Sequence, residues 1–457
     1  MTGTKDILLG KIRNGHEMTI GEQARLALIL SVPAILAQLS TVLMSYIDSA
    51  MVGNLGATPA ASIGLVSTST WIFGGFCMAT SSGFSVQVAH LIGANESAKA
   101  REILRKALTS VLIFSSALAL IGLGIANSLP GWLGGSPEIN RDATAYFTIY
   151  AAFLPLMQIS FTSGSMLQAS GNMKLPSILN VMMCIMDVAF NYLFIYVMDM
   201  GVRGAALGTG LAEGVTAALM LYFLTMRSPE LRLTQDRGSF MPDRECLKRA
   251  FGISGPMWLQ NVISRGAYIA STVIVAPLGT VAIAANSFAI TAESFCYMPG
   301  YGIQEASTTL IGQSLGARRK QLARKFAGIN ISLGAGLMGI LGIVMYALAP
   351  QMMDMLCNDQ EVIALGARVL RIEAFAELMY GASIVAYGCC VGGGDTLVPS
   401  ALNLLSMWVV RIGLATILTP AMGLTGYWLA MCIELNVRGL LFLWRIRGRK
   451  WMKLKIT

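Results

Sequence analysis

Twelve long apolar runs follow one another along the chain, and no other feature constrains the fold as strongly. Each holds about 20 to 30 residues, the length that an α-helix needs to cross a bilayer. Helices satisfy their backbone hydrogen bonds in lipid, and the runs lack the alternating pattern of a β-barrel. We therefore predict an all-α integral membrane protein with twelve transmembrane helices, near residues 26–52, 60–92, 107–129, 144–170, 175–198, 202–226, 250–276, 281–315, 326–349, 363–391, 397–420 and 425–444.

The net charge of +9 comes from Lys and Arg residues that gather in alternate connections. With both termini inside, most of the 33 basic residues fall on the cytoplasmic side, in segments 5–25, 99–106, 227–249, 318–325 and 445–455. This is the positive-inside bias that orients membrane proteins, so we predict cytoplasmic termini and no nucleic-acid partner. We also expect no cleaved signal sequence, because the first apolar run is already a full span.

Two parts of the sequence nearly duplicate each other at a constant spacing. QASGNMKLPSILN at 168–180 resembles CVGGGDTLVPSALN at 390–403, with Asn180 opposite Asn403 at an offset of 223. HLIGA at 90–94 resembles QSLGA at 313–317 at the same offset. Two six-helix halves enter the membrane with the same polarity, so we predict two bundles related by a pseudo-two-fold axis along the membrane normal. The predicted parts are a cytoplasmic segment, an N-lobe, a cytoplasmic linker, a C-lobe and a basic cytoplasmic tail, at 1–20, 21–226, 227–249, 250–446 and 447–457.

One carboxylate, Asp48, lies near the end of the first apolar run, in YIDSAMVG. A charged group at bilayer depth costs about 2.5 to 3.5 kcal/mol, so it normally faces a cavity or a partner and is a functional candidate. Gln38, Thr41 and Ser45 share one helix face with Asp48 and are candidates for lining a substrate cavity. In the second half Asp48 aligns with Ala270, so the acid belongs to one half only.

The fifth apolar run supplies candidate partners for Asp48. Asn180, Asp187 and Asn191 share one face of that helix. Two carboxylates close together in a low dielectric do not both ionise readily, which favours uptake of a proton. Carboxylate and amide oxygens also suit a small cation, so Asp48, Asp187 and Asn191 are candidates for a sodium site. The residues do not decide between the two ions, and hydrogen bonding between helices is the structural alternative.

Other polar residues of the spans give weaker signals. Glu305 lies deep in the eighth run, where it could contact a cationic substrate or pair with Arg265 or Arg411. Pro33 removes a backbone donor inside the first run, which favours a kink or hinge. The further membrane-depth acids are Glu213, Glu434, Glu293, Glu373 and Glu377, and we expect the first two to be structural.

The sequence contains no pattern typical of a catalytic or metal centre. Its eight cysteines include no CxxC pair, and it has only two histidines. We therefore expect neither an enzyme nor a resident cofactor or metal cluster.

Taken together, these features resemble the multidrug and toxic compound extrusion family, a branch of the MOP flippase superfamily of secondary transporters. The resemblance rests on SVPAILAQLSTVLMSYIDSAMVGNLG in the first span, on Gly-Ala pairs at 93–94 and 316–317, and on GGGDTLVPSALN after the tenth span. It covers the chain from about residue 20 to 445.

The resemblance implies an antiporter of the bacterial inner membrane that exports cationic or amphipathic compounds in exchange for protons or sodium. Such a protein meets small-molecule substrates and membrane lipids, and we expect it to function as a monomer. The resemblance further implies that Asp48 carries the coupling ion, that the first helix bends at Pro33 and that Thr209 lines the same lobe. Family members often have Asn four residues before Asp in the fifth helix, whereas here Asp187 precedes Asn191.

A second departure concerns the second half. Some family members carry acidic coupling residues in helices 7 and 10, where Val262 and Tyr380 stand in this chain, with Glu377 one turn from Tyr380. We therefore place coupling in the first half. The alternatives are a flippase or exporter of a lipid-linked or other endogenous metabolite in the same superfamily and, more remotely, a polytopic membrane enzyme or receptor.

Overall fold

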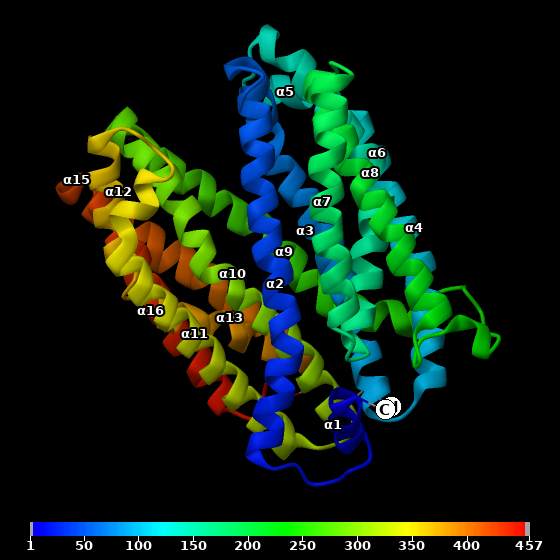
Figure 1. Cartoon of the computed structure of the whole chain (residues 1–457). Helices are drawn as coiled ribbons and strands as arrows, with labels where there is room; N and C mark the ends of the chain where they lie inside the picture. Colours follow the sequence, from blue (N-terminus) through cyan, green and yellow to red (C-terminus); the bar gives the residue numbers. More distant parts are fainter. Residues whose placement is uncertain (1–2, 453–457) are drawn as a thin grey trace. The chain divides into compact units, whose positions relative to one another are not determined.

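The computed structural model describes residues 3–452, and these fold into helices and short connections without a β-strand (Figure 1). The first two residues of the predicted N-terminal segment and the last five of the predicted basic tail lie outside the described residues. The all-α prediction is confirmed.

The predicted spans correspond in order to the long helices. These are α2 (Ile20–Gly53), α3 (Ala57–Gly93), α4 (Ser97–Ile125), α6 (Pro137–Ala169), α7 (Lys174–Tyr192) with η1 (Leu193–Val197), α8 (Gly201–Tyr222) with η2 (Phe223–Arg227), α9 (Arg244–Val275), α10 (Thr280–Gly316), α11 (Lys320–Asp354), α12 (Gln360–Glu373) with α13 (Glu377–Gly392), α14 (Leu397–Leu405) with η5 (Ser406–Ile412) and α15 (Gly413–Met422), and α16 (Leu424–Arg447). The shorter elements are α1 (Thr4–Arg13), α5 (Leu129–Trp132), η3 (Leu233–Gln235) and η4 (Ala276–Leu278).

Within the described part of the chain, 10 helices are each long and apolar enough to cross a membrane, and a bent pair of helices makes an eleventh candidate. The twelfth predicted span is α16, which is less apolar because it contains Glu434, Asn436 and Arg438.

We expected the tenth span, 363–391, to be one continuous helix, and that expectation was wrong. It consists of α12 and α13, which meet at an angle of 60°. A Cβ on Gly342 of α11 would come within 3.0 Å of the Ala374 carbonyl oxygen and 2.9 Å of the Glu377 Cβ, so α11 packs directly against the bend. No proline or glycine marks the break at residues 374–376, which is why the sequence did not predict it.

Two compact units make up the chain, with boundaries inside α2 and α9. Unit 1 joins the chain up to Leu39 to the part that follows from Leu259, and unit 2 holds Ser40–Trp258. The first parts of α2 and α9 therefore pack with the opposite half of the sequence. Each carries a proline before the boundary, Pro33 and Pro256. The predicted lobe limits follow the sequence duplication and stay a prediction.

In unit 2, α3, α4, α6, α7 and α8 pack around apolar clusters. Trp258 fixes the first part of α9 to this unit. Its ring stacks on Phe114 at 5.2 Å between centroids, and its indole nitrogen donates to the Phe76 carbonyl oxygen at 3.2 Å.

In unit 1, α10, α11, α13 and α16 pack side by side (Figure 1). A buried ion triad ties η5 to α16, because Arg411 and Arg438 both bind Glu434, at 2.7 and 2.6 Å. Both oxygens of the Glu434 carboxylate are thereby engaged, as a buried charge requires.

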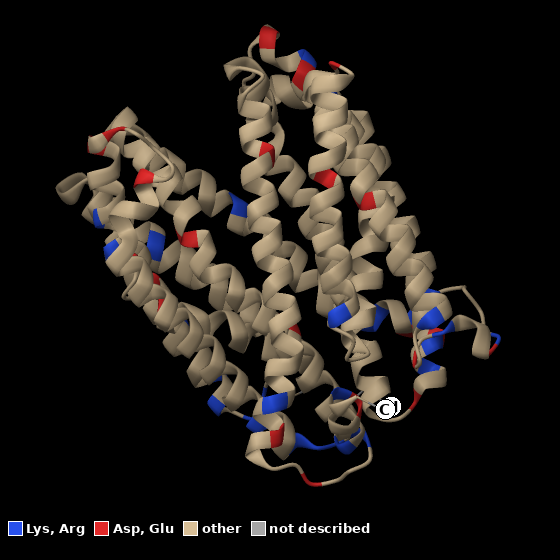
Figure 2. Ribbon diagram, in the orientation of Figure 1, with Lys and Arg blue, Asp and Glu red and all other residues tan. Residues whose placement is uncertain are grey.

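In each unit most Lys and Arg lie at one end of the helices (Figure 2). At that end of unit 2, the start of α4 holds the connection between α8 and α9. Arg101 and Arg105 bind Asp236, and Lys106 binds Asp243 at 2.7 Å. The Arg105 guanidinium, helped by that of Arg101, holds the pKa of Asp236 below its usual range, and Lys106 does the same for Asp243.

The same ion pairs explain why the helix of the predicted 107–129 span is longer than expected. Helix α4 begins ten residues earlier, at Ser97. Its basic first turns are stabilised by the acidic connection, so they stay helical beyond the apolar run.

We expect Asp236→Asn to loosen the connection, because it removes the charge that Arg101 and Arg105 share. Amide hydrogen exchange of residues 228–243 should become several-fold faster at neutral pH, whereas Asp354→Asn at an exposed site should leave it unchanged. Since the folded-state pKa of Asp236 is lowered, the pairing is complete at neutral pH and is lost as the pH falls through that lowered value. Equal exchange in the two variants would contradict this assignment.

Candidate ion-coupling site

A single carboxamide joins Asp48 on α2 to Asp187 on α7. The Asn191 Nδ2 donates one hydrogen bond to Asp48 Oδ1 at 3.0 Å and another to Asp187 Oδ2 at 3.1 Å. Asp187 and Asn191 are 1% and 2% exposed, and Asp48 is half-buried. All three residues belong to unit 2. The structure thus brings together the three residues that the sequence singled out for a proton or sodium.

The local helix geometry explains this meeting. Asp187 and Asn191 are four residues apart on α7, so their side chains lie on one face, a turn apart. After Asn191 the chain continues into the π-helical η1, where the Tyr196 hydroxyl donates to the Met51 carbonyl oxygen at 2.8 Å. This bond holds the last turn of α2 against η1 and so sets the height of Asp48 beside α7.

A glycine on α8 makes room for the carboxamide. A Cβ on Gly208 would come within 2.1 Å of Asn191 Oδ1 and 2.9 Å of the Asn191 backbone nitrogen. Only glycine therefore lets α8 approach α7 this closely while Asn191 keeps its position. Gly208 is one of 48 glycines, and the sequence alone does not single it out, because the facing helix is unknown at that stage.

Three further polar side chains surround the pair. The Thr209 hydroxyl on α8 approaches the Asp187 carboxyl group. Tyr146 on α6 lies close to both carboxyl groups, and Glu213 on α8 lies close to Asp187. Tyr146 was not among the predicted site residues, because an aromatic residue in an apolar run gives no functional signal by itself.

Two buried oxygens at this site accept no well-aligned hydrogen bond from any residue between 3 and 452. They are Asp187 Oδ1 and Asn191 Oδ1. Leaving a buried acceptor unpaired costs about 1–3 kcal/mol, and two adjacent carboxylates in a low dielectric repel each other. A proton on the pair, or a small cation among its oxygens, would relieve both. The chemistry of this donor set therefore fits one monovalent cation.

The remaining candidates on these two helices precede the pair along the chain. Asn180 precedes Asp187 by two turns of α7, about 10 Å along the axis, so it is beyond hydrogen-bonding reach of the pair. Thr41 and Ser45 precede Asp48 on α2 by seven and three residues, and both side chains are exposed. Their predicted roles stay predictions.

Gln38 and Glu305 meet within unit 1, where Gln38 Nε2 donates to Glu305 Oε1 at 2.9 Å. Beside them, a Cβ on Gly302 of α10 would come within 2.6 Å of the Ile35 backbone nitrogen. The backbones of α2 and α10 therefore touch just after Pro33, through which α2 continues unbroken. Arg411, one of the cations expected near Glu305, binds Glu434 instead.

Unit 1 also contains a separate group of buried acids. Glu373 and Glu377 are 0% exposed and Glu293 is 5% exposed. Across the described residues, none of the side-chain oxygens of Glu373 and Glu377 has a hydrogen-bond partner. Buried carboxyl groups without hydrogen-bond partners require a proton or a cation. Whether these acids of the second half take part in ion coupling is therefore a separate question.

We expect Gly208→Ala to disturb the coupling site, because its methyl group would overlap the Asn191 carboxamide. The change should destabilise the purified protein by about 1–3 kcal/mol in thermal unfolding, the usual effect of overpacking. Gly124→Ala on α4 is the matched control, since a Cβ there meets nothing within 4 Å. Equal stability of the two variants would show that Gly208 does not constrain Asn191.

Comparison with known proteins gives the same duplication. The family model described as MatE matches residues 33–193 and again 256–417, and the starts of the two matches are separated by the offset of 223 seen in the sequence. The probable multidrug resistance protein NorM of Mannheimia succiniciproducens is 24% identical over 453 residues, which are 95% of this chain and 96% of the relative.

Solved structures share the fold over nearly the full chain. A variant of the Vibrio cholerae MATE transporter VcmN matches with a TM-score of 0.88 at 20% identity, over 95% of this chain and 99% of that one. The bent form of VcmN matches with a TM-score of 0.85 at 20% identity, over 94% of this chain and 97% of that one. A MOP superfamily transporter from Pyrococcus furiosus matches with a TM-score of 0.88 at 20% identity, over 98% of this chain and 99% of that one.

These similarities confirm the predicted fold class of twelve membrane helices in two bundles. They also decide between a transporter and a membrane enzyme, because the match to one family covers both halves of the sequence. The chain belongs to the MatE family and is an integral membrane transporter of the multidrug and toxic compound extrusion type.

Proposed function

We propose that this protein is a secondary active efflux antiporter that exports cationic or amphipathic compounds in exchange for protons or sodium. One observation carries the proposal: Asn191 bridges Asp48 and Asp187, and this buried group has oxygens without a donor among the described residues. The name of the Mannheimia relative, a probable multidrug resistance protein, supports the substrate class.

In this proposal, the coupling ion neutralises the Asp48–Asp187 pair. A proton would do so while Asn191 Nδ2 keeps donating to both carboxyl groups. For sodium, a rotation of the carboxamide would turn Asn191 Oδ1 toward the pair and place three side-chain oxygens around the ion. Loss of the ion would leave two negative charges in a low dielectric, and their repulsion would separate α2 from α7.

The movement of α2 would link the ion to the exported compound. Pro33 deprives the helix of one backbone hydrogen bond, and Gln38 lies just beyond it. A bend at Pro33 would withdraw the Gln38 amide from Glu305 and present the Glu305 carboxylate to a cationic substrate. Ion and substrate would then favour opposite conformations of α2, so that loading one releases the other.

We further propose that both termini are cytoplasmic and that the membrane is the bacterial inner membrane. The gathering of Lys and Arg at one end of the helices in each unit supports this orientation. Each half of the chain supplies six spans, so we propose that a single copy suffices for transport.

Asp48→Asn should abolish gradient-driven efflux, because the carboxamide cannot exchange a proton or neutralise sodium. The test uses purified protein in liposomes, with dye extrusion followed while a proton gradient or a sodium gradient is imposed separately. Whichever gradient drives extrusion identifies the ion. Ser49→Ala is the matched control, since that hydroxyl donates to the Ser45 carbonyl oxygen of its own helix. Full efflux by Asp48→Asn would contradict the proposal.

Glu377→Gln tests whether coupling is confined to the first half. The glutamine side chain keeps the size of a protonated carboxyl group, so a Glu377 that never releases its proton can be replaced without loss. We expect efflux close to the wild-type rate in the same liposomes. If this variant lost gradient-driven efflux as Asp48→Asn does, the buried acids of unit 1 would have to be part of the coupling site.

A further inference from the structure

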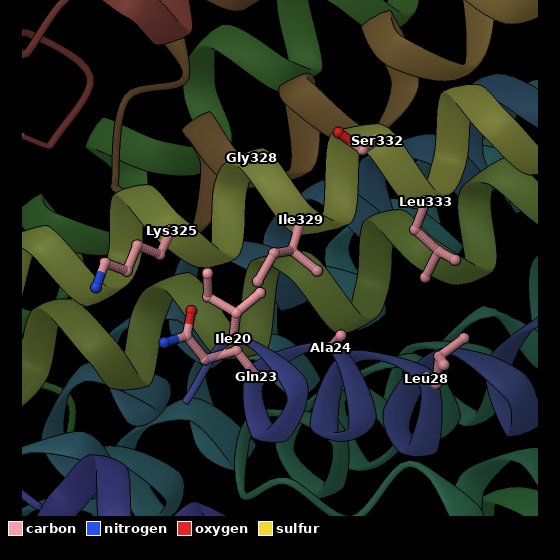
Figure 3. Close-up of a pocket in the computed structure, with 9 residues that line it drawn as sticks. All are labelled: Ile20, Gln23, Ala24, Leu28, Lys325, Gly328, Ile329, Ser332 and Leu333. Carbon is pink, nitrogen blue, oxygen red and sulfur yellow. The ribbon is translucent and has the colours of Figure 1, made fainter. Parts of the chain in front are cut away.

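A cavity of about 610 Å³ lies in unit 1 between the first turns of α2 and α11 (Figure 3). This volume falls within the usual range of small-molecule sites. Its walls are mainly apolar, with Ile20 and Leu28 on α2 and Ile329 and Leu333 on α11. The cavity takes no part in the coupling site, whose residues belong to unit 2.

The cavity has one polar end and one apolar end. Figure 3 shows Lys325 and Gln23 at one end and Leu28 and Leu333 at the other. Lys325 belongs to the basic stretch 318–325 that opens α11, and Leu333 is eight residues farther along the helix, about 12 Å. The cavity therefore runs from the basic surface of the bundle into the depth of the bilayer.

Gln23 offers an unused acceptor to an occupant. Its side chain is 1% exposed, and its Nε2 donates to the Met18 carbonyl oxygen at 2.9 Å. That bond fixes the orientation of the carboxamide. Its Oε1 is buried and accepts no hydrogen bond from residues 3–452, a condition that a ligand hydroxyl or ammonium group would relieve.

Gly328 forms the middle of the wall on α11. A Cβ there would meet nothing within 4 Å, so the missing side chain leaves space beside the exposed backbone. Ile329 and Leu333 line the same cavity beside this space.

We propose that this cavity binds one molecule of an anionic glycerophospholipid from the leaflet at the basic end of the spans. The lipid phosphate lies at Lys325, a headgroup hydroxyl donates to Gln23 Oε1, and an acyl chain follows the wall past Gly328. The charge selects an anionic lipid, because Lys320 and Arg324 accompany Lys325 on the same basic turns, and clustered cations beside a span attract anionic headgroups.

The test is native mass spectrometry of the purified full-length protein, titrated with phosphatidylglycerol or with phosphatidylcholine. Gly328→Leu should weaken phosphatidylglycerol binding about tenfold, because the new side chain fills the path of the acyl chain. Gly336→Leu is the matched control: it lies on the same helix, and a Cβ there also meets nothing within 4 Å. Leucine favours a helix over glycine at both positions, so both variants should fold.

Lys325→Gln provides a second, independent arm. It should weaken phosphatidylglycerol binding about fivefold and leave phosphatidylcholine binding unchanged, as expected for loss of one cation near a phosphate. Lys248→Gln, at an exposed lysine of α9 in unit 2, controls for the general basic surface. Wild-type binding of phosphatidylglycerol by Gly328→Leu, or equal binding of the two lipids by the unmodified protein, would overturn the proposal.

Discussion

The meeting of two carboxyl groups inside an apolar bundle of helices is the constraint on which the proposed coupling depends. The amide nitrogen of Asn191 donates to both Asp48 and Asp187. Two negative charges this close together in a low dielectric repel each other strongly. Two neighbouring residues hold the helices close enough for this contact. Gly208 lets α8 approach α7, and the Tyr196 hydroxyl holds the last turn of α2 in place.

Helix α2, which carries Asp48, crosses the boundary between the two compact units. The helix is continuous from Ile20 to Gly53, but Leu39 ends one compact unit and Ser40 begins the other. Its first part is held in unit 1 by the Gln38–Glu305 hydrogen bond and by the close approach of Gly302. Helix α2 therefore has residues in both units, and Pro33 lies between its start and the boundary.

Hydropathy predicted the helices, and helical periodicity placed Asp187 and Asn191 on one face, because both patterns depend on residues close together in one element. Asp48 was joined to them because a carboxylate in an apolar run needs a partner or a cavity. Contacts between elements lie beyond such patterns. The facing helix must be known before the roles of Gly208, Tyr146 and the bend between α12 and α13 can be recognised. Asn180 shares the same face of α7 but lies two turns before Asp187, and its predicted role stays a prediction.

The measurement that tests the central claim most directly is infrared difference spectroscopy of carboxyl groups in the purified protein, recorded against pH and, at constant pH, against sodium. The account predicts a protonated carboxyl group that ionises as protons are withdrawn, is lost in Asp48→Asn and remains in Glu377→Gln. If sodium is the coupling ion, adding sodium should ionise that same group. An unchanged titration in Asp48→Asn would contradict the claim that this pair carries the coupling ion.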